Sequence, residues 1–341
     1  MTALPLHNPL LALIVPVAAA LICAGLILLL RPLLQRYALA RPNARSSHVI
    51  PTPQGGGIAV MAATAIGALL AVWLGPPGLG VALAPALVAA AFLAAIGMVD
   101  DLSPVPVIPR LVLQLAAVML LFATLPSEIR IVEAVPVVLE RALMILAMLW
   151  FVNLVNFMDG LDLMTTAEML PITVALAAIA FYGQAPLAIL PVTLALAGAL
   201  LGFAPFNRPV AALFLGDVGS LPIGLLTGWC LFELAGHHHL AAALLLPLYY
   251  LADATITLLR RFANGERFWD AHRSHFYQRA TDNGFSVGQV VTTVFLLNIA
   301  LAGLAIASIA LGSTVLDLAL LAAGALGVTS VLVRFSRSRA N

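Results

Sequence analysis

Eleven apolar stretches divide the chain, and they constrain its fold more than any other feature of the sequence. A helix needs about 20 apolar residues to cross roughly 30 Å of hydrocarbon. We therefore expect an all-α fold, a polytopic transmembrane helical bundle with about 11 spans. The expected spans are residues 10–30, 57–74, 79–98, 111–125, 142–157, 171–182, 187–204, 221–235, 240–259, 290–311 and 315–333.

Composition supports insertion into a membrane. Of the 341 residues, 62% are hydrophobic and 9% are charged, whereas soluble domains carry about 25% charged residues. No polar stretch is long enough for a soluble domain, so we expect residues 1–341 to form a single membrane domain. The first apolar stretch is too long for a signal peptide and lacks a basic start, so we interpret it as a span. Cys23 and Cys230 lie in apolar stretches and predict no disulfide framework.

Arginine gives the expected orientation. All 16 basic residues are Arg, and 14 of them fall in alternate loops or in the C-terminal tail, on one side of the membrane. Because basic residues accumulate on the cytoplasmic side, we expect the N-terminus outside and the C-terminus in the cytoplasm. The net charge of +1 gives no reason to expect a nucleic-acid partner.

Polar motifs gather in the five expected cytoplasmic loops, about 31–56, 99–110, 158–170, 205–220 and 260–289. The first loop joins phosphate-binding side chains to three glycines that open a helix, where free N–H groups favour an anion. A simple turn between two spans is the alternative. Its candidate binding residues are Arg45, Ser46, His48 and Thr52.

Acidic residues mark the next three loops. Asp100 and Asp101 are adjacent like charges, which Mg²⁺ coordination would explain as well as a solvated helix end. Asp217, with Ser220, precedes a helix and suits either an N-cap or a metal-bound phosphate. In the third of the five loops and the helix before it, four polar residues at a spacing of three share one helix face, which predicts that they line a polar cavity. A glycine C-cap is the simpler account of the end of this helix. The four residues are Asn153, Asn156, Asp159 and Asp162.

The last loop carries a cationic cluster. Asp253 lies within an expected span near its cytoplasmic end, where a charge usually faces a cavity or a partner. Two histidines amid arginines, on the side of the carboxylates, favour binding of a phosphate group. The cluster contains Arg261, His272, Arg273, His275 and Arg279.

Together these segments resemble the polyprenyl-phosphate N-acetylhexosamine-1-phosphate transferases, the MraY/WecA superfamily (glycosyltransferase family 4). The resemblance covers all five loops in the family's order, from about Arg41 to Arg279. Residues 42–53 and the segment His-Arg-Ser-His-Phe-Tyr-Gln-Arg at 272–279 are most similar to the WecA/WbpL-type branch, which starts O-antigen and related glycans. Gln54 departs from that branch, where a basic residue is common.

The resemblance implies that a UDP-N-acetylhexosamine reacts with polyprenyl (undecaprenyl) phosphate to give polyprenyl-diphospho-sugar and UMP. It implies a bacterial inner-membrane protein with a cytoplasmic active site, a prenyl groove between spans, and a homodimer, which is common in the family. The implied cofactor is Mg²⁺, or Mn²⁺, held mainly by Asp217 with help from Asp101. Asp100 would orient or deprotonate the lipid phosphate, and direct displacement and a covalent Asp intermediate both stay open.

The remaining assignments follow from the same resemblance. Catalytic roles go to Asp100, Asp101, Asp217, His272 and His275. Binding of the nucleotide, diphosphate, sugar or lipid phosphate goes to Arg45, Ser46, His48, Thr52, Asn153, Asn156, Asp159, Asp162, Asp253, Arg261, Arg273 and Arg279.

A secondary transporter is the alternative function, because it also has many spans and intramembrane carboxylates. Transporters place such charges near the midplane and often contain internal repeats. Here the carboxylates lie at one face of the expected bundle and no repeat is evident, so the sequence favours the enzyme.

The arginine distribution leads to a topology prediction. We expect Arg45, Asp100, Asp159, Asp217 and His272 to face the cytoplasm. Single cysteines at these positions should resist a membrane-impermeant thiol reagent added to intact cells and react after the cells are opened. Rapid labelling from outside would refute the orientation.

Overall fold

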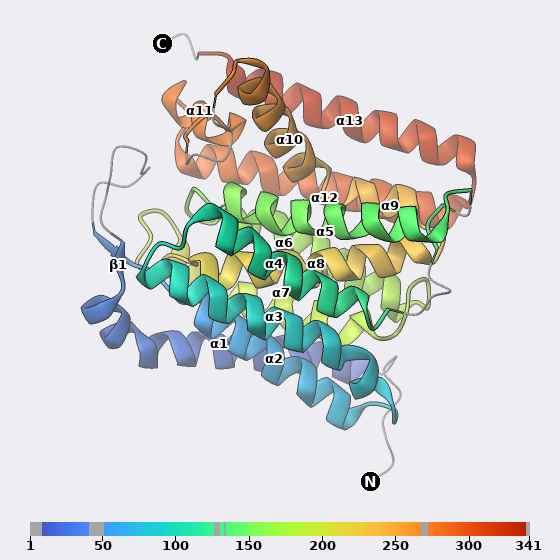
Figure 1. Ribbon diagram of the computed structural model, residues 1–341, viewed down its shortest axis with the longest axis horizontal. Helices are drawn as coiled ribbons and strands as arrows, with labels where there is room; N and C mark the ends of the chain where they lie inside the picture. Colours follow the sequence, from blue (N-terminus) through green and yellow to red (C-terminus); the bar gives the residue numbers. More distant parts are fainter. Residues whose placement is uncertain (1–8, 41–50, 126–129, 133, 267–271, 339–341) are drawn as a thin grey trace.

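The computed structural model describes residues 9–40, 51–125, 130–132, 134–266 and 272–338, which form helices and one small sheet (Figure 1). The elements are α1 (Pro9–Tyr37), β1 (Leu39–Ala40), β2 (Thr52–Pro53), α2 (Gly56–Leu74), α3 (Leu79–Leu102), α4 (Val107–Phe122), α5 (Val137–Met158), α6 (Met164–Phe181), α7 (Ile189–Asn207), α8 (Asp217–Gly236), α9 (Leu240–Leu245), α10 (Leu248–Ala263), α11 (Phe276–Asp282), α12 (Val287–Leu311) and α13 (Thr314–Ser336).

The predicted all-α membrane bundle is confirmed. Within the described residues, nine helices are long and apolar enough to cross a membrane: α1, α2, α3, α5, α6, α7, α8, α12 and α13. The start of α1 and the end of α13 lie at opposite ends of the bundle (Figure 1). Which end faces the cytoplasm stays a prediction.

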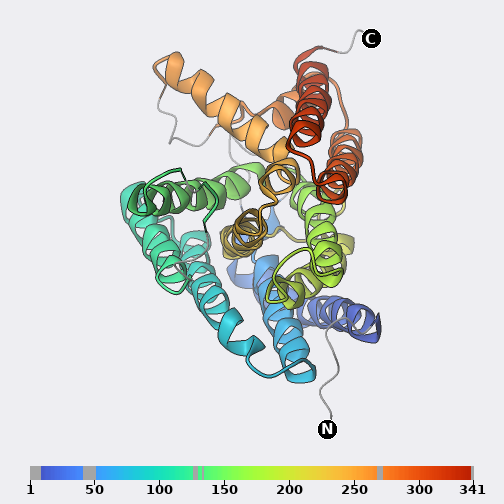
Figure 2. The ribbon, with the colours of Figure 1, turned by 90° about the vertical axis from the view of Figure 1, so that its right-hand side faces the viewer.

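Two of the eleven expected spans differ from simple crossing helices. The expected span 111–125 corresponds to α4, an apolar helix of 16 residues. The expected span 240–259 is broken into α9 and α10 at Leu246 and Pro247. Proline removes a backbone donor and its ring clashes with the preceding turn, which accounts for the break. Beyond it, α10 diverges from the bundle (Figure 2).

The expected loop 158–170 is shorter than predicted. Helix α6 begins at Met164, not at Pro171, and Pro171 lies inside it. The first turns of α6 contain buried Thr and Glu side chains, which lowered the apparent hydropathy of the segment. Proline is tolerated within a transmembrane helix when neighbouring groups satisfy the freed carbonyl.

Helix α8 lies at the centre of the bundle viewed end-on (Figure 2) and contacts α2, α3, α5, α6, α7 and α9. Glycines let its first turn approach its neighbours closely. A Cβ on Gly57 of α2 would lie 2.3 Å from the Gly219 Cα, and a Cβ on Gly97 of α3 would lie 2.3 Å from the Asp217 carbonyl oxygen. The backbones of α2 and α3 therefore fix the N-terminus of α8.

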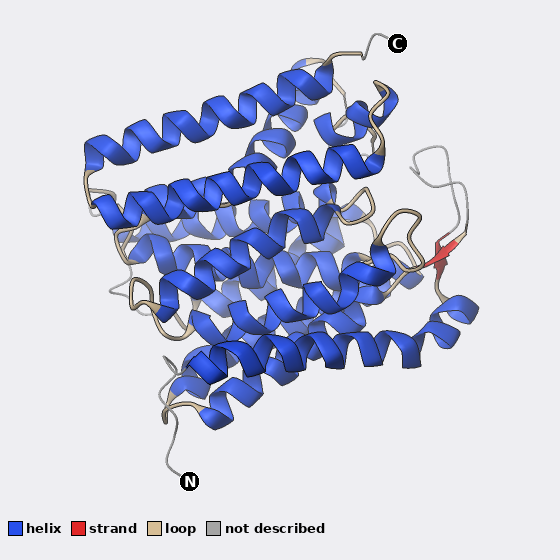
Figure 3. Cartoon of the chain, turned by 180° about the vertical axis from the view of Figure 1, so that it is seen from behind, coloured by secondary structure: helices blue, strands red, loops and turns tan. Residues whose placement is uncertain are grey.

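The strands add a third support at the same end of the bundle (Figure 3). β1 pairs antiparallel with β2, and Gln54 then forms an isolated parallel bridge to Phe214. The N–H groups of Gly56 and Gly57 donate to the carbonyls of Phe214 and Leu215, each at 2.8 Å. The chain around β2 is thus bonded to the segment that leads into α8.

The glycine contact generates a stability prediction. Gly57→Ala should lower the thermal midpoint of the purified protein, because overpacking against a backbone typically costs about 1–3 kcal/mol. Gly303→Ala is the matched control, since a Cβ at this helical position meets no atom within 4 Å. The control should be neutral or slightly stabilising, and equal midpoints for both variants would contradict this packing.

Candidate functional site

A polar cavity of about 280 Å³ opens where the C-terminal ends of α3 and α5 meet the N-terminal end of α8. Four carboxylates and four side-chain amides belong to its lining, so it suits a polar ligand with several hydrogen-bonding groups. Its lining residues are Gln54, Asp101, Asn156, Asp159, Gly160, Leu161, Asp162, Asn207, Phe214, Leu215, Gly216, Asp217 and Gln278.

Asp101 caps α8 from the end of α3. Its Oδ1 accepts the Asp217 N–H at 2.9 Å and its Oδ2 accepts the Val218 N–H at 3.1 Å. Gly216 leaves room for this contact, because its φ is 78° and a Cβ there would lie 2.5 Å from Asp101 Oδ2. Both carboxylate oxygens thus satisfy N–H groups that a helix start leaves unpaired. Helix capping is therefore the role that the geometry gives Asp101 within the chain.

Arg110, on the first turns of α4, joins two of the predicted acids. Its Nη1 donates to Asp100 Oδ2 at 2.8 Å and lies 3.8 Å from Asp217 Oδ2. Asp100 also accepts the Val105 N–H at 2.6 Å, which fixes the turn between α3 and α4. The Arg110 guanidinium thus lies between Asp100 and Asp217 and offsets the repulsion between these two carboxylates.

Asp217 is held from its other side by α5. Asn156 Nδ2 donates to Asp217 Oδ1 at 2.7 Å and to Ser220 Oγ at 2.9 Å. Among the residues described, no group of three or more His, Cys, Asp or Glu could hold a metal ion. The single carboxylate of Asp217 in a polar cavity nevertheless fits Mg²⁺, because this ion typically takes one or two protein carboxylates and completes its coordination with water and substrate phosphates.

Asp159 and Asp162 occupy the turn between α5 and α6. Thr165 donates a hydrogen bond to Asp159, and the buried Asp162 accepts the Ala211 N–H at 3.0 Å. Burial and the carboxylates of Asp101 and Asp162 raise the pKa of Asp159 to about 7. Asp159 therefore exists as a mixture of its protonated and ionised forms near neutral pH.

The basic loop is anchored by Asp253, whose carboxylate is completely buried. It accepts the N–H groups of Phe276 and Tyr277 at 3.0 and 3.1 Å, and His275 Nδ1 lies 3.2 Å from Asp253 Oδ1. Asp253 and His275 are thus bonded to each other and do not line the polar cavity. The sequence predicted that Asp253 binds substrate, whereas in the structure its carboxylate anchors the loop.

His272 stacks on His275, with ring centroids 4.8 Å apart. Burial, His275 and Arg261 lower the pKa of His272 to about 4, so its imidazole is neutral at physiological pH. His272 can therefore act through hydrogen bonds and does not supply a positive charge.

The other predicted residues are spread around the site. Arg45, Ser46 and His48 lie outside the described residues. Thr52 is buried in β2. Three arginines surround the last loop: Arg261 pairs with Glu266 at 2.7 Å, Arg273 pairs with Asp282 at 3.2 Å, and Arg279 is exposed on α11.

Several cavity residues were not predicted. Gln54 lines the cavity and donates through Nε2 to the Asp101 carbonyl at 2.8 Å. Gln278 is 7% exposed, and its Oε1 has no hydrogen-bond partner within the described residues. Phe214 adds an aromatic ring to the lining. Gln278 belongs to the segment that carried the resemblance, which was its only sequence signal.

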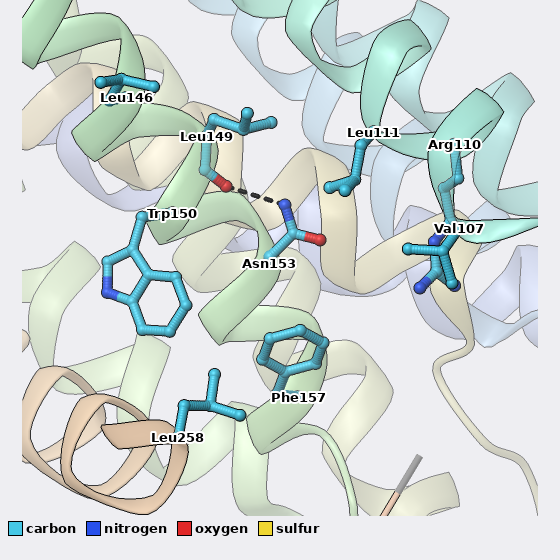
Figure 4. Close-up of a pocket in the computed structure, with 9 residues that line it drawn as sticks. All are labelled: Val107, Arg110, Leu111, Leu146, Leu149, Trp150, Asn153, Phe157 and Leu258. Atoms are coloured by element: carbon cyan, nitrogen blue, oxygen red, sulfur yellow. Dashed lines mark hydrogen bonds between the residues drawn. The ribbon is translucent and has the colours of Figure 1, made fainter. Parts of the chain in front are cut away.

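An apolar groove of about 260 Å³ lies beside the polar cavity, between α4, α5 and α10 (Figure 4). Asn153 belongs to this groove, where its Nδ2 donates to Gln114 Oε1 and the Leu149 carbonyl. Arg110 carries the only charge among its lining residues, and it also pairs with Asp100 and lies 3.8 Å from Asp217 of the polar cavity. The groove is lined by Val107, Arg110, Leu111, Leu146, Leu149, Trp150, Asn153, Phe157 and Leu258.

Comparison with known proteins decides the family. A protein-family sequence model described as glycosyl transferase family 4 matches residues 83–235. A decaprenyl-phosphate N-acetylglucosaminephosphotransferase of Mycobacterium tuberculosis (strain CDC 1551 / Oshkosh) is 30% identical over 299 residues, covering 76% of this chain and 72% of the relative. The chain belongs to glycosyl transferase family 4, the polyprenyl-phosphate N-acetylhexosamine-1-phosphate transferase superfamily.

Two further members of this family show where the similarity extends. A probable undecaprenyl-phosphate N-acetylglucosaminyl 1-phosphate transferase of Bacillus subtilis (strain 168) is 25% identical over 301 residues, covering 82% of this chain and 81% of the relative. A phospho-N-acetylmuramoyl-pentapeptide-transferase of Streptococcus thermophilus (strain CNRZ 1066) is 43% identical over only 74 residues, which is 22% of each chain. Among these three relatives, the similarity that extends over most of the chain is to the two N-acetylglucosamine enzymes.

The pKa of Asp159 leads to a testable pH dependence. As the pH rises from 6 to 8, Asp159 ionises and becomes a better acceptor for ligand hydroxyls, so the Kd for UDP-N-acetylglucosamine should fall. Asp159→Asn cannot ionise and should bind more weakly with a flatter pH profile. Isothermal titration of both proteins measures this, and identical profiles would exclude Asp159 as the titrating group.

Proposed function

We propose that this protein transfers an N-acetylhexosamine 1-phosphate from a UDP-sugar to polyprenyl phosphate. The observation that carries the proposal is the position of Arg110, which lines the apolar groove, pairs with Asp100 at 2.8 Å and lies 3.8 Å from Asp217 of the polar cavity. A water-soluble nucleotide sugar fits the cavity, and a prenyl chain fits the groove. Their phosphates would meet at Arg110, next to the start of α8.

The reaction joins the lipid phosphate to the sugar phosphate. An oxygen of polyprenyl phosphate attacks the β-phosphorus of the UDP-sugar, and the bond from that phosphorus to the bridging oxygen breaks. The bridging oxygen leaves with UMP, and polyprenyl-diphospho-sugar is the other product. Direct attack needs no covalent enzyme intermediate, so it is the route we propose.

Charge neutralisation is the main task of the site, because two anionic phosphates must approach each other. Arg110 would hold the lipid phosphate, and Asp100 would fix the Arg110 guanidinium through their 2.8 Å contact. The free N–H groups and dipole at the start of a helix also favour an anion. Asp217, oriented by its hydrogen bond from Asn156, would hold Mg²⁺, which when bound neutralises the diphosphate and polarises its oxygens.

The turn after α5 would bind the nucleotide. Asp159 and Asp162 present acceptors for ribose hydroxyls or base N–H groups, and Phe214 offers an aromatic face. His272 and Arg273 would hydrogen-bond the diphosphate or sugar, and His275 would hold their loop through Asp253. The remaining basic residues of the expected cytoplasmic face would draw the anionic donor toward the cavity.

The extended similarity to N-acetylglucosamine enzymes supports an N-acetylhexosamine donor. We propose that the reaction takes place at the cytoplasmic face of a bacterial inner membrane. There it would start O-antigen, lipopolysaccharide or a related cell-envelope glycan.

UMP release tests the function. Purified protein should release UMP from a UDP-N-acetylhexosamine only when polyprenyl phosphate and Mg²⁺ are both present. A panel of UDP-sugars then identifies the donor. UMP release without polyprenyl phosphate would indicate hydrolysis, and substrate uptake into vesicles without UMP release would indicate a transporter.

Asp217→Asn separates the metal site from the rest of the cavity. The change keeps the side-chain size and removes its charge, so turnover should fall on the order of a hundred- to a thousand-fold, as for loss of one transition-state contact. The Mg²⁺ concentration that gives half-maximal rate should also rise. Wild-type turnover and metal dependence in this variant would move the metal assignment to Asp100 and Asp101.

A further inference from the structure

A buried carboxylate outside the cavity lies at the break between α9 and α10. Glu168 of α6 is 0% exposed. Its Oε1 accepts the Tyr250 N–H at 3.3 Å, and its Oε2 accepts a hydrogen bond from the side chain of Asn298 on α12. One carboxylate therefore joins three helices at the point where the membrane-embedded chain changes direction.

The break explains why an acceptor is needed there. The first N–H groups of a helix have no partner within it, and a buried unpaired N–H is costly. An N-cap side chain normally supplies the acceptor, but the residue before α10 is Pro247 and makes no side-chain cap. Glu168 supplies this acceptor from another helix. A buried ionisable residue within a membrane bundle is expensive, which favours a specific role over passive packing.

Helix α10 carries this constraint to the basic loop. Tyr249, adjacent to the Glu168-bonded residue, donates through its hydroxyl to Asp253 Oδ2 at 3.2 Å. Asp253 in turn binds the N–H groups at the start of α11 and the ring of His275. Tyr277 then donates to the Phe157 carbonyl at 3.1 Å, which seats α11 against the end of α5. Hydrogen bonds and the backbone of α10 thus connect Glu168 to the start of α11 and to Phe157, which lines the apolar groove.

The same helix also forms part of the apolar groove. Leu258, two turns beyond Tyr250, is the α10 residue in its lining. A change in the direction of α10 would therefore displace the groove wall and the basic loop together.

We propose that Glu168 is a positioning residue for the transferase: it fixes the direction of α10 and thereby places the His272–Gln278 segment and the groove wall beside Arg110. This inference rests on the proposed function only for its kinetic readout. Glu168 touches neither the cavity nor the groove, so it acts through α10.

Two substitutions at Glu168 separate its shape from its hydrogen bonds. In Glu168→Gln, the amide oxygen can still accept the Tyr250 N–H, and the amide nitrogen can donate to Asn298 once that side chain turns over. This variant should retain near wild-type activity. Glu168→Leu removes both bonds, and kcat/KM should fall about a hundredfold, the loss that a displacement of roughly 1 Å can cause.

A matched control and a double-mutant cycle exclude general destabilisation. Thr173→Val removes another buried polar group of α6, whose hydroxyl bonds only to the α6 carbonyls of Met169 and Leu170, and should leave activity unchanged. In a His275→Ala background, Glu168→Leu should add little further loss, because both changes disrupt the same loop. Losses that multiply would overturn the proposal.

Cysteine labelling gives a readout that is independent of activity. Ser274→Cys places a thiol in the loop, and the native Cys23 and Cys230 are buried and contribute little background. Glu168→Leu should accelerate maleimide labelling several-fold, whereas Glu168→Gln and Thr173→Val should not. Unchanged labelling in Glu168→Leu would overturn the inference, while absence of sugar-phosphate transfer by the wild-type protein would refute only the proposed function.

Discussion

The close packing of the first turn of α8 is the constraint on which the site depends. Gly57 and Gly97 let α2 and α3 touch its backbone, and Asp101 accepts the N–H groups of Asp217 and Val218. A helix start held in this way has little freedom to move. Asp217 is consequently presented to the cavity at a fixed position, with Asn156 on one side and Arg110 on the other.

The second organising feature is the boundary between the polar cavity and the apolar groove. Substrates of opposite solubility need separate binding environments. Burying a polar nucleotide sugar among apolar side chains is costly, and so is leaving a prenyl chain exposed to water. α4 connects the two environments: its apolar residues line the groove, and Arg110 reaches Asp100 and, at 3.8 Å, Asp217 of the polar cavity. The divergence of α10 at Pro247 completes the groove on the other side through Leu258.

Much of the architecture could be predicted from apolar length, and the cavity's acids could be predicted from their spacing. Asp159, Asp162, Asp217 and Asn156 do line one cavity. The break in the expected span 240–259 and the early start of α6 were missed, because hydropathy measures polarity and does not detect a helix break or a buried polar turn.

Individual roles were harder to predict than location. The sequence cannot show that Asp101 faces two N–H groups from a helix more than a hundred residues away, or that Asp253 bonds to the start of α11. Arg110 carried no motif of its own, and its importance depends on where α4 places it. Such roles arise from tertiary contacts between segments that are distant in sequence.

The meeting of the two substrates at Arg110 is tested most directly by the kinetics of Arg110→Gln with each substrate varied in turn. We expect a large rise in KM for polyprenyl phosphate, with a smaller change in KM for the UDP-sugar, because the guanidinium would bind the lipid phosphate. An unchanged KM for polyprenyl phosphate, together with wild-type kcat, would contradict the placement of the lipid phosphate between the groove and the polar cavity.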